Sequence, residues 1–132
     1  MLICFFPGLL ITGGDSYDGD PQHTAEVWLP GDRSCQLPRL PAPGRRWHTQ
    51  SSFTACGGQQ TRFSCLTFTA GEWEQSHSLS EERYEHVSWQ SPAGILLMGG
   101  YFPDYIASQS SELLSTTTDT TTSSFRLPYE TM

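Results

Sequence analysis

The chain has few basic residues and no long apolar run. Its 132 residues include 7 Lys and Arg against 14 Asp and Glu, which gives a net charge of −7. Patches of Lys and Arg bind nucleic acids and anionic membrane surfaces, so this balance argues against both kinds of partner. No apolar stretch approaches the roughly 18 residues of a membrane-spanning helix, and we expect no membrane insertion.

Patterns of catalytic and metal-binding residues are also missing. No activated nucleophile and no coupled acid–base pair is evident, so we expect no catalytic residue and no enzymatic activity. The 4 cysteines form no Cys-x-x-Cys pair, which argues against zinc. Asp15, Asp18 and Asp20 crowd one loop, but the glutamate that closes a calcium-binding loop is absent. We therefore expect neither a cofactor nor a bound metal.

Helical periodicity is absent, whereas turn-forming residues are frequent. The chain contains 9 prolines and 12 glycines. No window shows the apolar period of an amphipathic helix. Short apolar stretches separated by turn residues indicate an all-β fold.

A pair of adjacent glycines closes a short apolar run three times. The pairs are Gly13-Gly14, Gly57-Gly58 and Gly99-Gly100, so their first glycines are 44 and 42 residues apart. A period of this size indicates that one supersecondary unit was copied. Glycine tolerates positive φ and lets another backbone approach closely, so we expect each pair at a tight part of the fold.

The repeated units agree beyond the glycines. Each pair is followed by a polar loop, a second apolar stretch, a turn and a further strand; the second stretches are residues 26–29, 65–68 and 112–114. An arginine, Arg46 or Arg83, then leads to the next unit. We therefore expect about four strands per unit and one domain over residues 1–132, with units at about 1–44, 45–82 and 83–132.

These units resemble the kelch repeat of β-propellers. The family combines a Gly-Gly pair with an aromatic residue on the third strand, a tryptophan that opens the fourth, and an arginine before the next unit. Besides the glycines, the matching residues are Trp28 and Arg46, then Phe68, Trp73 and Arg83, then Phe125, with Cys35 where the first unit's tryptophan is expected. The resemblance implies an incomplete kelch-like β-propeller of about three four-stranded antiparallel blades.

Three blades fall short of a closed ring, because propellers typically have about four to eight. The chain is therefore expected to be a fragment of a larger protein, a truncated product, or a piece that closes by assembly. Open blade edges could support self-association. Residues 1–6 are apolar without a preceding basic segment, and we expect them to form the innermost strand of the first unit rather than a signal peptide.

Two of the cysteines are expected to form a disulfide. Cys56 ends the second strand of the middle unit and Cys65 opens the third, so the two residues should face each other across an antiparallel pair. Cys4 and Cys35 fall on an inner and an outer strand and are not expected to be partners. A Cys56–Cys65 bridge would indicate a secreted or extracellular protein, whereas two buried thiols would fit the cytoplasm.

Candidate contact residues fall in the loops after the glycine pairs and in the segments between units, which should emerge on one face. Arg46 and Arg83 match the repeat arginine and are expected to be structural. Exposed aromatics beside arginine suit a recognition surface. The candidate partner-binding residues are Arg45 and Arg62, which are off the repeat pattern, and the loop aromatics Tyr101, Phe102 and Tyr105.

The resulting functional hypothesis is a non-catalytic protein-interaction module of kelch type. Its parent would be secreted or extracellular, with a cytoplasmic location as the alternative. Two other functions remain open: a fragment of a copper-dependent propeller oxidase whose site lies in missing blades, and a truncated product without function.

Overall fold

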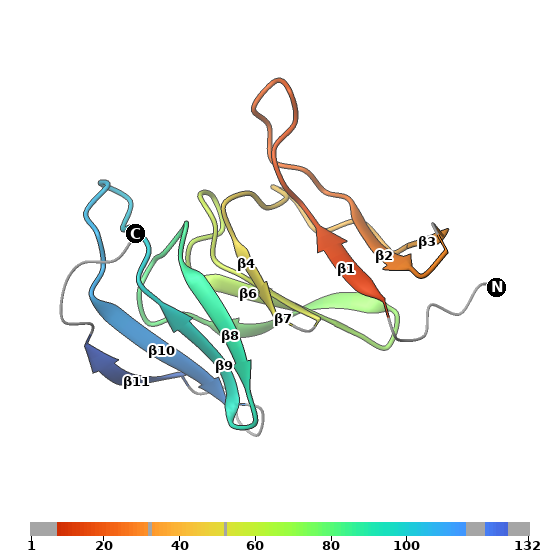
Figure 1. Cartoon of the computed structure of the whole chain (residues 1–132). Coiled ribbons are helices and arrows are strands. Elements are labelled where there is room, and N and C mark those ends of the chain that lie inside the picture. The colour runs from red at the N-terminus through yellow and green to blue at the C-terminus, as the bar shows by residue number, and fades with distance from the viewer. Residues whose placement is uncertain (1–7, 32, 52, 116–120, 127–132) are drawn as a thin grey trace.

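The computed structural model describes residues 8–31, 33–51 and 53–115, and the backbone of residues 121–126. Within this part of the chain there are strands and no helix, and the strands form three antiparallel sheets (Figure 1). The expected all-β class is confirmed.

The first sheet has three strands in sequential order: β1 (Leu9–Thr12), β2 (Ala25–Leu29) and β3 (Arg33–Gln36). Its β1–β2 register places Leu9 opposite Trp28 and Thr12 opposite Ala25. Trp28 therefore lies at the end of the sheet away from the first glycine pair. The strand expected over residues 1–6 lies outside the described residues.

The second and third sheets have four strands each, again in sequential order. The second contains β4 (Thr49–Ser51), β5 (Thr54–Cys56), β6 (Ser64–Thr69) and β7 (Glu72–Ser78). The third contains β8 (Val87–Ser91), β9 (Gly94–Met98), β10 (Ser110–Ser115) and β11 (Thr121–Arg126). All three expected second apolar stretches lie within strands, namely β2, β6 and β10.

The Thr-rich segment after β10 differs in part from its expected role. The turn expected after the second apolar stretch of each unit corresponds here to the Thr-rich residues 116–122, but β11 already begins at Thr121. Residues 116–120 lie outside the described part of the chain. The last two threonines can join the strand because β-branched side chains fit a pleated surface well.

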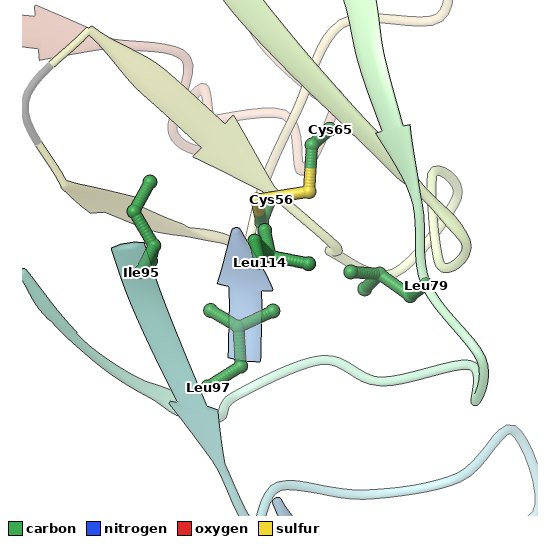
Figure 2. Close-up of a cluster of buried hydrophobic side chains, with 6 residues drawn as sticks. All are labelled: Cys56, Cys65, Leu79, Ile95, Leu97 and Leu114. Carbon is green, nitrogen blue, oxygen red and sulfur yellow. A yellow bond between two sulfur atoms is a disulfide. The ribbon is translucent and has the colours of Figure 1, made fainter. Parts of the chain in front are cut away.

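Consecutive sheets bury apolar side chains between them. The cluster between the second and third sheets consists of Cys56, Cys65, Leu79, Ile95, Leu97 and Leu114 (Figure 2). The cluster between the first and second sheets consists of Leu10, Val27 and Cys35, with Leu29, Leu37, Phe53 and Trp73 packed against it. A single sheet of this size cannot cover both of its faces, so each sheet depends on its neighbour for a core.

The predicted disulfide between Cys56 and Cys65 is confirmed. The two residues are direct partners in the β5–β6 register, with a Cα–Cα distance of 4.1 Å. Both are buried, and the bond lies in the core between the second and third sheets (Figure 2). Cys35 is disulfide-bonded as well. Cys4 lies outside the described residues.

The glycine pairs occupy equivalent places. A Cβ atom added to Gly58 would lie 2.6 Å from the carbonyl oxygen of Arg46, and one added to Gly100 would lie 2.6 Å from that of Tyr84. Both glycines have positive φ, 111° and 88°. A side chain at either position would therefore meet backbone as well as strain, which explains the glycine at both places.

Candidate functional site: the connector face

Two segments join the sheets, and we call them the first connector (residues 37–48) and the second connector (residues 79–86). Each ends in Arg-x-x-His, as Arg45 to His48 and Arg83 to His86. The arginine carbonyls bind the preceding sheet: Arg45 accepts from the Gly14 N–H at 2.7 Å, and Arg83 accepts from the Gly58 N–H at 3.1 Å. The connectors are therefore anchored in the same way.

The following residue of each connector binds the next sheet. The carbonyl of Arg46 accepts from the Gln59 N–H at 3.1 Å, and that of Tyr84 accepts from the Tyr101 N–H at 2.9 Å. Each connector thus holds two glycine-pair loops together. We call the surface formed by these connectors and loops the connector face.

This geometry corrects the register of the repeat arginine. Arg45, rather than Arg46, is the counterpart of Arg83. The side chain of Arg45 is buried, with 2% of the residue exposed. Arg45 therefore does not present its guanidinium on the connector face. Arg46 instead pairs with the carboxylate of Asp15 at 3.2 Å, and its side chain is 17% exposed.

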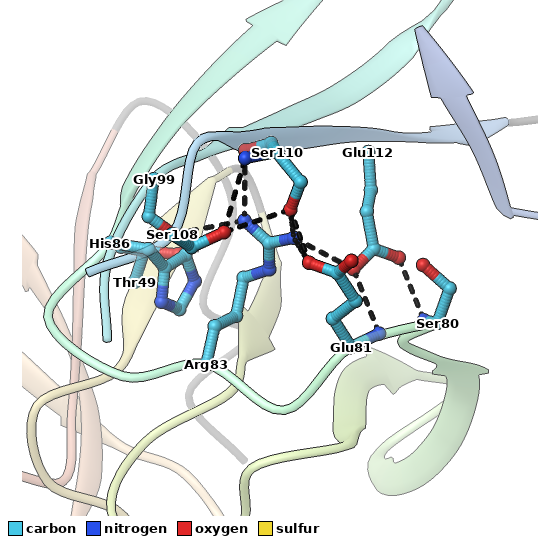
Figure 3. A network of polar contacts seen from close by, with 9 residues as sticks. All are labelled: Thr49, Ser80, Glu81, Arg83, His86, Gly99, Ser108, Ser110 and Glu112. Atoms are coloured by element: carbon cyan, nitrogen blue, oxygen red, sulfur yellow. Dashed lines mark hydrogen bonds and ion pairs between the residues drawn. The ribbon is translucent and has the colours of Figure 1, made fainter. Parts of the chain in front are cut away.

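Arg83 is fully buried in a polar network with the third sheet (Figure 3). Its guanidinium donates to the carbonyl of Gly99 at 2.9 Å and to the hydroxyl of Ser110 at 2.7 Å. Two carboxylates complete the network: Glu112 lies 3.1 Å away and Glu81 lies 3.4 Å away. The positive charge of this arginine is balanced within the protein.

Arg45 makes the matching contacts with the second sheet. It donates to the carbonyl of Gly57 at 2.9 Å, to the carbonyl of Ser64 at 2.8 Å and to the hydroxyl of Ser64 at 2.6 Å. Burial lowers the pKa of Arg45 to about 10. The group therefore remains charged at neutral pH, although its surroundings disfavour the charge.

The two connector histidines are held as neutral imidazoles. Nε2 of His48 lies 3.1 Å from the hydroxyl of Thr12, and Nε2 of His86 lies 2.7 Å from that of Thr49. Burial and the charge of Arg45 lower the pKa of His48 to about 4. Burial, helped by the charges of Arg83 and His48, lowers the pKa of His86 to about 3.

Aromatic rings form a continuous row along the connector face. Tyr84 is buried at its centre, with ring centroids 5.9 Å from Trp47 and 5.8 Å from Tyr101. Tyr105 meets Tyr84 edge-on at 6.3 Å. Trp47 is 37% exposed and Tyr105 is 73% exposed, so the row presents ring surface to solvent while its centre is packed.

The first connector extends this row toward the loop after Gly14. The guanidinium of Arg46 lies 5.0 Å from the ring centroid of Trp47 and pairs with Asp15 at 3.2 Å. The indole N–H of Trp47 donates to the other oxygen of Asp15 at 3.1 Å. Asp15 therefore positions both side chains.

The connectors are also bonded to each other. The N–H of Glu85 donates to the carbonyl of Trp47 at 2.8 Å. Both residues have positive φ, 52° and 55°. This backbone conformation is uncommon outside glycine, and here it recurs at the same place in both connectors.

Of the predicted contact residues, Tyr101, Phe102 and Tyr105 lie on this face. Arg62 lies beside it, paired with Glu82 at 3.6 Å, and its Nε–H donates to the carbonyl of Gln59 at 2.6 Å. Trp47 and Tyr84 were not among the predicted residues, and Arg46 was expected to be structural. The sequence signal that could have found them is their position. Arg46 and Tyr84 directly follow the buried arginine of their connector, and Trp47 comes one residue later.

Among the described residues, no three His, Cys, Asp or Glu side chains gather closely enough to hold a metal ion. None of these residues belongs to a helix with the length and apolarity needed to cross a bilayer. In comparison with known proteins, no protein-family model matches the chain, and no curated protein matches it significantly.

Proposed function

We propose that the chain is part of a kelch-like β-propeller and serves as a non-catalytic protein-interaction module that binds its partner through the connector face. The repeated architecture supports the first part of this proposal. Three sequentially ordered antiparallel sheets are joined by connectors that make equivalent hydrogen bonds. Repeated sheets that cover one another are the principle on which propellers are built.

The aromatic row is the observation that carries the binding function. Its exposed members, Trp47 and Tyr105, both contact the buried ring of Tyr84. Exposed aromatic and arginine side chains on a rigid base are typical of the residues that dominate protein interfaces. The adjacent guanidinium of Arg46 is fixed by Asp15, so little side-chain entropy would be lost when a partner binds.

The parent protein is proposed to be secreted or extracellular. A disulfide between Cys56 and Cys65 fits an oxidising compartment. The three described sheets fit a piece of a larger ring.

The function can be tested by quantitative affinity capture from an extracellular protein extract. The bait is the folded chain, compared with the variants Trp47→Ser and Tyr105→Ser. The matched control is Trp28→Ser, because Trp28 is a comparably exposed aromatic (48%) at the other end of the first sheet.

We expect at least one protein to be captured by the unmodified chain and by Trp28→Ser, and at least tenfold less by both connector-face variants. When that protein is purified, its affinity must also be highest for the unmodified chain and Trp28→Ser and lower for both connector-face variants. The proposal is wrong if capture is unchanged in both connector-face variants, or if Trp28→Ser alone abolishes it.

A further inference from the structure

The two buried connector arginines differ in how their charge is balanced. Arg83 pairs with Glu112 of β10 at 3.1 Å (Figure 3). The other oxygen of Glu112 accepts from the N–H of Ser80 at 2.8 Å. One carboxylate thus neutralises the arginine and ties the connector to the third sheet.

Arg45 has the same anchor but lacks this carboxylate. Among the described residues, no Asp or Glu forms an ion pair with it. The two sheets align through the serines that the arginines bind, Ser64 and Ser110. Two residues after Ser110 stands Glu112, and two residues after Ser64 stands Leu66.

Open space lies beside Arg45. A groove of about 420 Å³ runs between the first connector and the second sheet, bordered by Pro41, Pro43, Arg45, Leu66, Trp73 and Gln75. A water molecule occupies about 30 Å³ in the liquid, so this groove has room for a small ligand or a side chain. The region therefore combines a buried cation with space for an anion.

A buried charge without a counter-ion is unfavourable, and supplying the counter-ion is correspondingly favourable. Arginine binds a carboxylate best through charge-assisted hydrogen bonds. The hydroxyl of Ser64 and two backbone carbonyls already fix the guanidinium of Arg45, so it needs no rearrangement to receive a ligand.

We propose that this groove is a carboxylate-binding subsite in which a ligand carboxylate pairs with Arg45, as Glu112 pairs with Arg83. The carboxylate can belong to a small acid or to the Asp or Glu side chain of a peptide. The subsite does not depend on the aromatic row of the connector face.

The test is a titration followed by two-dimensional NMR of the Arg45 Nε–H and the Trp73 indole N–H. The probes are acetate and glutamate blocked at both its amino and α-carboxyl ends. Their matched neutral controls are acetamide and blocked glutamine. We expect saturable shifts with the carboxylates and at least tenfold weaker effects with the amides.

The two carboxylate probes distinguish the ligand sources. Blocked glutamate binding at least tenfold more tightly than acetate supports a peptide side chain, whereas equal or weaker binding supports a small acid. Saturation by neither carboxylate, or equal responses to carboxylate and amide, overturns the proposal.

Leu66→Glu provides the decisive variant, because it supplies an internal carboxylate at the position that Glu112 has in the third sheet. We expect it to abolish carboxylate binding, while Leu66→Gln, of the same shape without the charge, retains it. Unchanged binding in a folded Leu66→Glu variant would overturn the proposal. Trp47→Ser should bind the probes normally, which separates this subsite from the connector-face function.

Discussion

The first and second connectors place the same two residues, arginine and histidine, in the same backbone setting. Both arginines donate to two backbone carbonyls and a serine hydroxyl. Only Arg83 also pairs with carboxylates, those of Glu81 and Glu112, whereas no ion pair to Arg45 is found among the described residues. The difference teaches that the repeat specifies backbone hydrogen bonds in both connectors, while charge balance is settled by residues that belong to one unit alone.

The largest effect is expected from Glu112→Gln. The change leaves Arg83 buried with only the partly exposed Glu81 as counter-ion, which makes the second connector resemble the first. Breaking a buried ion pair by removing one partner typically destabilises by about 3–5 kcal/mol. Urea unfolding monitored by circular dichroism measures this.

Glu85→Gln is the control for Glu112→Gln, because it removes one carboxylate of the second connector that forms no ion pair among the described residues. It should change the free energy of unfolding by less than about 0.5 kcal/mol. Equal stability of Glu112→Gln and the unmodified chain would mean that the two connectors are electrostatically alike.

Acidification should weaken both connectors in the same way. The folded-state pKa values of His48 and His86 are lowered to about 4 and about 3, so only the unfolded chain takes up these protons as the pH falls from 6.5. Stability is therefore complete above about pH 6.5 and declines below it. By pH 5 each histidine contributes a loss of about 2 kcal/mol.

Variants separate these histidines from the carboxylates that also titrate in acid. In His48→Gln and His86→Gln, the loss of unfolding free energy between pH 7.5 and pH 5 should shrink by about 2 kcal/mol each. A pH dependence that is identical in all three proteins would show that neither imidazole is protected from protonation.

A glycine comparison tests the close approach between connector and sheet. Gly14 and Gly58 are equivalent second glycines with φ of 106° and 111°. A Cβ at Gly58 would meet the carbonyl of Arg46, whereas one at Gly14 would meet nothing within 4 Å. Alanine at Gly58 should therefore destabilise the fold by about 2 kcal/mol more than alanine at Gly14, since crowding a packed site typically costs about 1–3 kcal/mol.

Thermal and urea unfolding of the two glycine variants give the difference directly, because the backbone strain is shared. Equal losses of unfolding free energy in the two variants would mean that backbone strain alone requires glycine. They would also mean that the first connector tolerates a side chain at Gly58, next to the carbonyl of Arg46.

The smallest effect is expected at the surface of the first connector. Arg46→Ala removes the ion pair with Asp15, and partly exposed pairs typically contribute about 1 kcal/mol or less. The same variant should broaden or shift the amide resonances of the loop that contains Asp15, which NMR detects. A loss above about 2 kcal/mol would give Arg46 the structural role that Arg45 has.

The sequence predicted features that depend on local pattern. Spacing along a single sheet predicted three features: the strands at residues 26–29 and 65–68, the Cys56–Cys65 bridge, and the placement of glycine pairs at tight parts of the backbone. These features could be predicted because alternation and turn residues determine which residues of neighbouring strands face each other.

The sequence did not separate Arg45 from Arg46, because adjacent arginines carry the same chemical signal. Only the distance to the following histidine, three residues for both Arg45 and Arg83, distinguishes them. The exposure of Trp47 and the burial of Tyr84 depend on contacts between units, which a pattern within one unit does not encode.

The hydrogen bond from Glu85 to the carbonyl of Trp47 has a mechanical consequence. It ties one connector to the next, so a sheet cannot swing away without breaking the link to its neighbour. Force applied by a partner at Tyr105 would be shared along the backbone rather than borne by one sheet. The described sheets should consequently melt as a single cooperative unit, with one transition in calorimetry.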